Sequence, residues 1–217
     1  MIVKSFGCSF VWGSELSDIN LKNKKFSSLT WPALIANKKQ AQYQCHARPG
    51  AGNFFILQSL LNQLQDPDDL YIVNWTFHGR YDYVFAHGEK TTTSWHSITP
   101  WDMHDRAKFY YQNFHSELVD KLQNLIWISS AVAALTEVNA KFCMTYMDNL
   151  LFDSRWNCTP AMIKLQETVR PHLHQFEGQN FVDWSQKNQY PIGSVGNHPL
   201  EQAHAAAAEY LINQRLV

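Results

Sequence analysis

The sequence lacks the features that would place the chain in a membrane or direct it out of the cell. No stretch approaches the roughly 20 consecutive apolar residues that a membrane-spanning helix needs. The N-terminus has no basic region followed by an apolar segment, because Lys4 and Ser5 interrupt its first apolar run. We therefore expect no signal peptide, no membrane partner and a cytoplasmic location.

An excess of charge of one sign is also missing. Lys and Arg number 18 against 19 Asp and Glu, and both signs are mixed along the chain. Nucleic-acid-binding surfaces are strongly basic, so no nucleic-acid partner is expected. The four cysteines form no C-x-x-C pair, which favours free thiols in a reducing compartment. The ten histidines lack the paired spacing of zinc sites, and we expect no metal or other cofactor.

What the sequence does contain is an alternation of short apolar segments with helical patterns. Its 217 residues suit a single domain, 1–217. The expected strands are Ile2–Gly7, Ala41–Cys45, Leu70–Trp75, Lys141–Tyr146 and Asn180–Asp183. The expected helices are Trp31–Lys38, Asn53–Gln65 with Asn53 as its cap, Asp105–Val138 as one helix or two, and Leu200–Leu216. This order predicts an α/β fold whose parallel sheet is covered on both faces.

Ser9 leaves the first strand in the turn Gly7-Cys8-Ser9, with Gly13 four residues further on. Sites in parallel sheets lie at the carboxyl ends of strands, and Ser9 occupies such an end. A serine hydroxyl becomes a nucleophile when a base takes its proton. Gly7 lets the chain turn sharply and leaves backbone N–H groups near Ser9 to face an oxyanion. The alternative is a serine that only caps the turn; Cys8 as nucleophile is disfavoured because it points to the opposite face.

His198 is the candidate base. It lies in Gly196-Asn197-His198-Pro199, directly before the last helix. Alone it would be interpreted as a helix-entry residue. Paired with Ser9 across one sheet, it is interpreted as the group that takes the serine proton.

The two motifs together resemble the SGNH (GDSL-like) hydrolase superfamily. The family's first block is Gly-Asp-Ser with a Gly four residues after the serine, and here Cys8 replaces the Asp. The family's last block is Asp-x-x-His, and here Val195 replaces the Asp before His198. The resemblance implies a flavodoxin-like three-layer α/β/α sandwich with about five parallel strands. Divergent blocks and a small size also resemble phage-encoded members, for which a virion-associated location is the alternative.

The middle blocks of the family supply oxyanion donors. The resemblance assigns one donor to Ser9 and another to Gly50, which follows the second strand, with Gly52 as its rival. A plain strand-to-helix turn explains the same glycines without catalysis. The family's third donor is an Asn after the third strand; Asn74 and Thr76 lie near that position but outside its frame.

The triad acid is also displaced from its usual position. Asp183, at the end of the expected fifth strand, is the nearest alternative acid for His198. A backbone carbonyl holding the ring, which would leave a Ser–His dyad, is the other interpretation.

The segment of about 77–104 is expected to be a long insertion. It has no clear period and is rich in aromatic residues, which is typical of lids and binding loops. Trp and Tyr stack on sugar rings and also fill cores. Trp75, Trp95 and Trp101 are therefore expected to line a carbohydrate cleft beside Ser9, or to pack in the core and the loop.

What the resemblance implies is a serine esterase that removes a small, acetyl-like group, with a small-molecule or glycan ester as substrate. Ser9 would attack the acyl carbon and His198 would transfer the proton. Two alternatives stay open: an O-acyltransferase acting on glycans, and a non-catalytic phage or glycan-binding module that retains the fold. The oligomeric state is left open.

Overall fold

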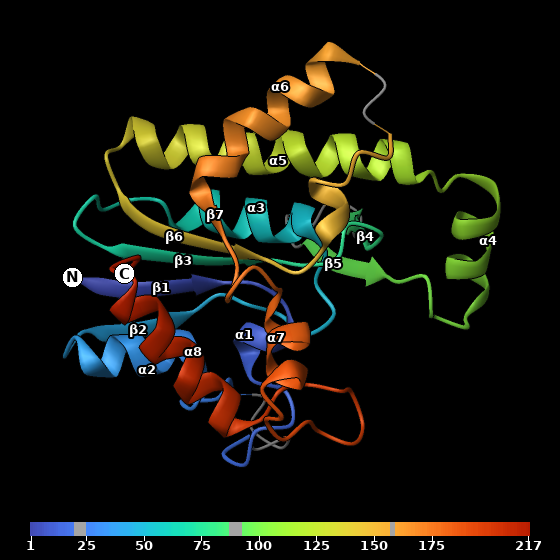
Figure 1. Cartoon of the computed structure of the whole chain (residues 1–217). Coiled ribbons are helices and arrows are strands. Elements are labelled where there is room, and N and C mark those ends of the chain that lie inside the picture. Colours follow the sequence, from blue (N-terminus) through green and yellow to red (C-terminus); the bar gives the residue numbers. More distant parts are fainter. Residues whose placement is uncertain (20–24, 87–92, 157–158) are drawn as a thin grey trace.

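A computed structural model of the chain describes residues 1–19, 25–86, 93–156 and 159–217. Its centre is a five-stranded parallel sheet in the order β2-β1-β3-β6-β7. The strands are β1 (Ile2–Phe6), β2 (Gln42–Cys45), β3 (Leu70–Trp75), β6 (Lys141–Tyr146) and β7 (Leu173–His174). The parallel arrangement brings the carboxyl ends of all five strands to one edge of the sheet (Figure 1).

The middle of the sheet carries the core. All six residues of β3 are buried, and β3 pairs along its whole length with β6, from Leu70 opposite Lys141 to Trp75 opposite Tyr146. A strand covered on both faces needs apolar side chains on both, which explains why every residue of this segment except Asn74 is apolar or aromatic.

Helices cover both faces of the sheet (Figure 1). One face carries α3 (Asn53–Gln63), α5 (Glu117–Glu137) and α6 (Pro160–Val169), and the other carries α2 (Trp31–Lys38) and α8 (Glu201–Asn213). The short side chains of α8, namely Ala203, Ala207 and Ala208, are buried and let the helix pack closely. The expected three-layer α/β/α fold is confirmed.

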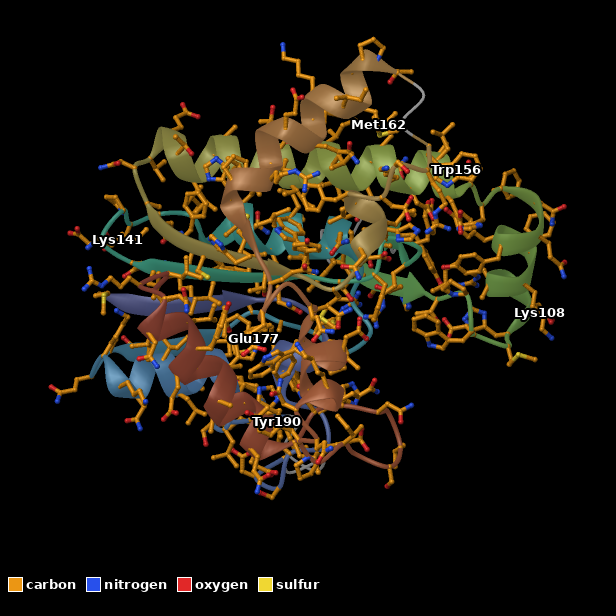
Figure 2. All side chains as sticks on the ribbon, viewed as in Figure 1. Lys108, Lys141, Trp156, Met162, Glu177 and Tyr190 are labelled. Atoms are coloured by element: carbon orange, nitrogen blue, oxygen red, sulfur yellow. The ribbon has the colours of Figure 1, made fainter. Side chains whose placement is uncertain are left out.

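The carboxyl edge of the sheet carries the remaining elements. These are α1 (Ser9–Trp12), the hairpin β4 (Tyr81–Ala86) and β5 (Thr93–Ile98), α4 (Asp105–Asn113), η1 (Asn149–Leu151) and α7 (Phe181–Lys187), whereas η2 (Arg170–His172) leads into the amino end of β7. Figure 2 shows Lys141, at the start of β6, on the side of the molecule opposite to Lys108 of α4. The hairpin and α4 therefore extend the molecule beyond the ends of the strands.

Two expectations about this edge are wrong. The segment of 77–104, expected to be irregular, contains the antiparallel hairpin, in which Asp82 is buried while Tyr81 and Val84 are exposed. The segment Asn180–Asp183 is the cap and first turn of α7 instead of a strand, because the Asn180 side chain accepts a hydrogen bond from the Asp183 N–H at 2.9 Å. The fifth strand is the two-residue β7.

Cys8, Cys45 and Cys143 are free thiols, and Cys158 lies outside the described residues. In the part of the chain that the structure describes, no helix has both the length and the apolar character required to cross a bilayer.

Candidate active site

A cavity of about 660 Å³ opens at the carboxyl edge of the sheet. Its wall is built from α1, from the loops after β2 and β3, from the segment between β5 and α4, and from the segment before α8. The cavity brings Ser9, Gly50, Trp101 and His198 to one place although they are distant in sequence. These four belong to the site residues that the sequence predicts.

Ser9 is the first residue of α1 and is only 8% exposed. The turn before it requires glycine, since a Cβ on Gly7 would lie 2.6 Å from Val11 Cγ2. The Ser9 hydroxyl donates a long hydrogen bond of 4.0 Å to Cys8 Sγ. Cys8 itself is fully buried and its sulfur accepts a hydrogen bond from Thr76 Oγ1 at 3.3 Å. Of the two side chains, the one that reaches the cavity is Ser9.

The ring of His198 is fixed by a carboxylate. Its Nδ1 lies 2.6 Å from Glu15 Oε2, and the ring packs against Phe10 with 5.2 Å between centroids. An ionised carboxylate accepts hydrogen bonds only, so Nδ1 carries the proton. The lone pair of His198 is therefore on Nε2, the nitrogen that a general base uses.

Glu15 is held in turn by the backbone before α8. Its carboxylate accepts hydrogen bonds from the N–H groups of Val195 at 2.8 Å, Gly196 at 2.8 Å and His198 at 3.3 Å. Burial opposes ionisation, but the hydrogen bonds from His198 and from these N–H groups outweigh it and lower the pKa of Glu15 to about 2. Glycine is needed in this loop, because a Cβ on Gly196 would lie 2.4 Å from His198 Cε1.

The acid that contacts His198 is thus Glu15, and the structure places Asp183 elsewhere. Asp183 lies in the first turn of α7, where its Oδ2 accepts a hydrogen bond from Asn180 Nδ2 at 2.7 Å. Val195, at the position of the family's acid, contributes its backbone N–H to Glu15 instead of a side chain. The sequence does not single out Glu15, because the family's acid is expected just before the histidine and Glu15 follows the serine motif instead.

The candidate oxyanion donors divide into two groups. Gly50 lines the cavity with a φ of +76°, and open space surrounds its Cα on the side where a Cβ would lie. The rival Gly52 donates its N–H to Asp82 Oδ1 at 2.9 Å, so this donor is occupied. Asn74 and Thr76 are 1% exposed and do not line the cavity. The expectation that they face the site is wrong, because both lie beneath it.

Hydrogen bonds under the site explain those two positions. Asn74 Nδ2 donates to Thr145 Oγ1 at 2.8 Å. The N–H of Thr76 donates to Asn53 Oδ1 at 2.7 Å. Asn53, expected as the helix cap, is the first residue of α3 and ties that helix to the end of β3.

The cap of α3 comes from the hairpin instead. Asp82 of β4 accepts hydrogen bonds from the N–H groups of Gly52 at 2.9 Å and Phe55 at 2.8 Å. Gly52 occupies the cap position without a side chain, and a Cβ there would lie 2.6 Å from Asp82 Oδ2. A buried carboxylate at a helix N-terminus also complements the helix dipole. The hairpin thus fixes the loop that carries Gly50.

The three tryptophans have different environments. Trp75 is fully buried and its Nε1 donates to Met144 Sδ at 3.4 Å, so it is a core residue and not a substrate-binding one. Trp95 packs against Phe54 and Phe55 of α3 and does not line the cavity. Trp101 does line it and is 60% exposed.

No three His, Cys, Asp or Glu side chains of the described ranges gather as a group that would hold a metal ion. The arrangement therefore offers a serine, an imidazole and a backbone donor in one cavity, and the imidazole is oriented by the carboxylate of Glu15. Such a set suits acyl transfer through a covalent serine intermediate.

No protein-family profile and no characterised protein sequence matches this chain. Several solved structures share its fold. A carbohydrate esterase whose active site is described as having divergent catalytic and non-catalytic binding functions is 15% identical, with a TM-score of 0.55 over 99% of this chain and 67% of that one. The protein TesA is 11% identical, with a TM-score of 0.53 over the whole of both chains. The psychrotrophic esterase EstA from Pseudoalteromonas sp. is 13% identical, with a TM-score of 0.50 over 98% of this chain and 94% of that one.

These likenesses place the chain in a fold class. It has the fold of the SGNH (GDSL-like) esterases, as the resemblance of the Ser9 and His198 motifs predicts.

Proposed function

We propose that the protein is a serine esterase that removes a small acyl group, such as an acetyl group, from a carbohydrate. The observation that carries the proposal is the 2.6 Å contact between His198 Nδ1 and Glu15 Oε2 at the cavity that Ser9 also lines. This contact orients the ring and leaves Nε2 as a base toward the cavity.

The reaction follows from these positions. Ser9 Oγ attacks the acyl carbon, and its proton passes to His198 Nε2. The N–H groups of Ser9 and Gly50 stabilise the oxyanion, and His198 returns the proton to the leaving alcohol. Water then attacks the acyl-enzyme by the same route and releases the acid.

One movement is required before the first step. The Ser9 hydroxyl bonds to Cys8 Sγ, so it has to turn toward His198 when substrate binds. Catalytic hydrogen bonds are commonly long without substrate and tighten in the complex. Because sulfur is a weak hydrogen-bond acceptor, the loss of the bond to Cys8 Sγ has a small energetic cost.

Glu15 stabilises the positive charge that forms on His198 during the reaction. Its lowered pKa keeps it ionised throughout the neutral range, so it stabilises the imidazolium of the transition state. Unlike a bare dyad, the site thus has a complete Ser–His–acid set.

The carbohydrate part of the proposal has two supports. Trp101 offers an exposed aromatic face at the cavity, as sugar-binding sites do. The neighbours in fold include a carbohydrate esterase and an acetyl xylan esterase from Butyrivibrio proteoclasticus, which is 15% identical with a TM-score of 0.50 and of which this chain covers 64%.

The first test is a fluorophosphonate probe read by intact mass. We expect one adduct on the wild type and none on Ser9→Ala. Ser14→Ala is the matched control, because Ser14 also lines the cavity and should keep the adduct.

The outcomes separate the alternatives. An adduct with release of acetate from acetylated sugars supports the esterase. An adduct without release, but with acetyl transfer to a glycan hydroxyl, indicates the O-acyltransferase. A folded wild type without an adduct indicates the non-catalytic glycan-binding module.

A further inference from the structure

Arg80 forms part of the same cavity wall, and the reaction proposed above does not use it. It follows β3 and its side chain is largely buried, since the residue is 8% exposed. Its Nη1 donates to the carbonyl of Ala51 at 3.0 Å. The guanidinium lies over the rings of Phe77 at 5.5 Å and Trp101 at 5.6 Å.

The positive charge of Arg80 has no ion-pair partner among the described residues, and its buried Nε has no hydrogen-bond acceptor there. Asp102, which lines the cavity as well, accepts a hydrogen bond from the N–H of Thr99 at 2.7 Å. Arg48, in the loop after β2, has such a partner, because its Nη2 lies 3.7 Å from Asp82 Oδ1. The two arginines therefore differ in whether the protein itself supplies the counter-charge.

Burial of a cation without a counter-charge is strongly unfavourable. A ligand that brings its own negative charge removes this cost. The guanidinium group suits oxyanions because it presents several N–H donors in one plane. A single cation matches a singly charged carboxylate better than a doubly charged phosphate ester.

We propose that Arg80 binds a carboxylate of the substrate, so that the protein acts on acyl esters of acidic compounds, such as acetylated uronic acids. The carboxylate lies in the sugar or in the acyl group, and in both cases it forms the same ion pair with the guanidinium of Arg80. The inference rests on the proposed esterase function. Arg80 is then a specificity-determining residue, and the Phe77 and Trp101 rings hold its guanidinium in place.

The test compares matched esters on the wild type and on Arg80→Gln. Acetylated glucuronic acid and acetylated glucose differ in the sugar carboxylate, and p-nitrophenyl hemisuccinate and p-nitrophenyl acetate differ in the acyl carboxylate. In one of the two pairs we expect kcat/KM for the acidic ester to fall roughly 10- to 100-fold in Arg80→Gln, the usual effect of one charged hydrogen bond, with little change for the neutral ester.

Two further variants complete the design. Arg80→Lys keeps the charge without the planar donor set and should retain part of the preference. Arg155→Gln is the matched control, because Arg155 is exposed, pairs with Asp153 at 3.0 Å and does not line the cavity. Thermal unfolding of each variant shows that it is folded.

Equal losses on acidic and neutral esters would overturn the proposal and would place Arg80 at the reacting carbonyl. A wild type without preference for either acidic ester would also overturn it. Failure of the esterase function itself is distinguished by the absence of any hydrolysis. In that case an NMR titration with glucuronate and with glucose decides, since Arg80 should still be required for binding of the acid alone.

Discussion

Two histidine–carboxylate pairs of the described residues share one geometry and differ in their surroundings. His198 with Glu15 and His78 with Asp148 both join Nδ1 to a carboxylate oxygen. In both, the same carboxylate also accepts the backbone N–H of its histidine, at 3.3 Å and 3.1 Å respectively. The two histidine side chains are equally exposed, at 15%.

The difference is what faces the ring. His198 lines the cavity together with Ser9, whereas His78 does not line it. Asp148 also accepts the N–H of Leu150 at 3.0 Å, so the second pair fastens the loop after β3 to the loop after β6. An oriented imidazole is therefore common to structural and catalytic roles, and the nucleophile and the cavity distinguish them.

The largest effect should come from removing each histidine. His198→Ala should lower kcat/KM on p-nitrophenyl acetate by about a thousand-fold or more, because Ser9 loses its base. His78→Ala should change kcat/KM little and should lower the free energy of unfolding by about 1–3 kcal/mol, because Asp148 loses a partly buried hydrogen-bond partner.

Turnover and urea unfolding, measured on both variants, give the check. A loss of turnover in His78→Ala as deep as that in His198→Ala, with the fold intact, would contradict the distinction between the two pairs.

The next effect concerns the acid. Glu15→Gln should lower kcat by about 10²- to 10⁴-fold, since an amide no longer stabilises the imidazolium or selects the tautomer. Asp183→Asn is the matched control and should leave kcat nearly unchanged, because Asp183 bonds to Asn180 in α7. The measurement is kcat at saturating ester; an intact kcat in Glu15→Gln would favour the dyad.

This pair of acids shows where sequence reasoning fails. Ser9 and Gly50 could be predicted because small residues at strand ends define local turns. Glu15 bonds to residues about 180 positions away in the sequence, and its backbone has a φ of +70°. No sequence pattern predicts either feature. The apolar residues between Asn180 and Asp183 predict a strand, whereas Asn180 is the cap that begins α7.

The sequence of the hairpin is equally hard to interpret. A half-buried strand is recognised by apolar side chains that alternate with polar ones and point inward. In β4 this pattern is reversed, because the charged Asp82 is buried while the aromatic Tyr81 is exposed. The carboxylate is tolerated inside because Gly52 and Phe55 donate to it. Because Asp82 points inward, it caps α3 and fixes the loop that carries Gly50. The buried carboxylate that obscures the strand pattern therefore also positions part of the site.

The smallest expected effect is on stability in acid. The pKa of Glu15 falls from 4.5 to about 2 on folding, so the unfolded chain binds a proton in this range that the folded chain does not. The stabilisation is therefore present above about pH 4.5 and is lost as the pH falls toward 2.

His78 lowers the pKa of Asp148 against the effect of burial, so both pairs should lose stability in acid. Urea unfolding from pH 6 to pH 3 should show a shallower loss of stability in Glu15→Gln than in the wild type, and the change should be modest because solvent screens a carboxylate that is only partly buried. An unchanged slope would mean that the hydrogen bonds to Glu15 do not persist in solution, and with them the difference between the two pairs would lose its electrostatic basis.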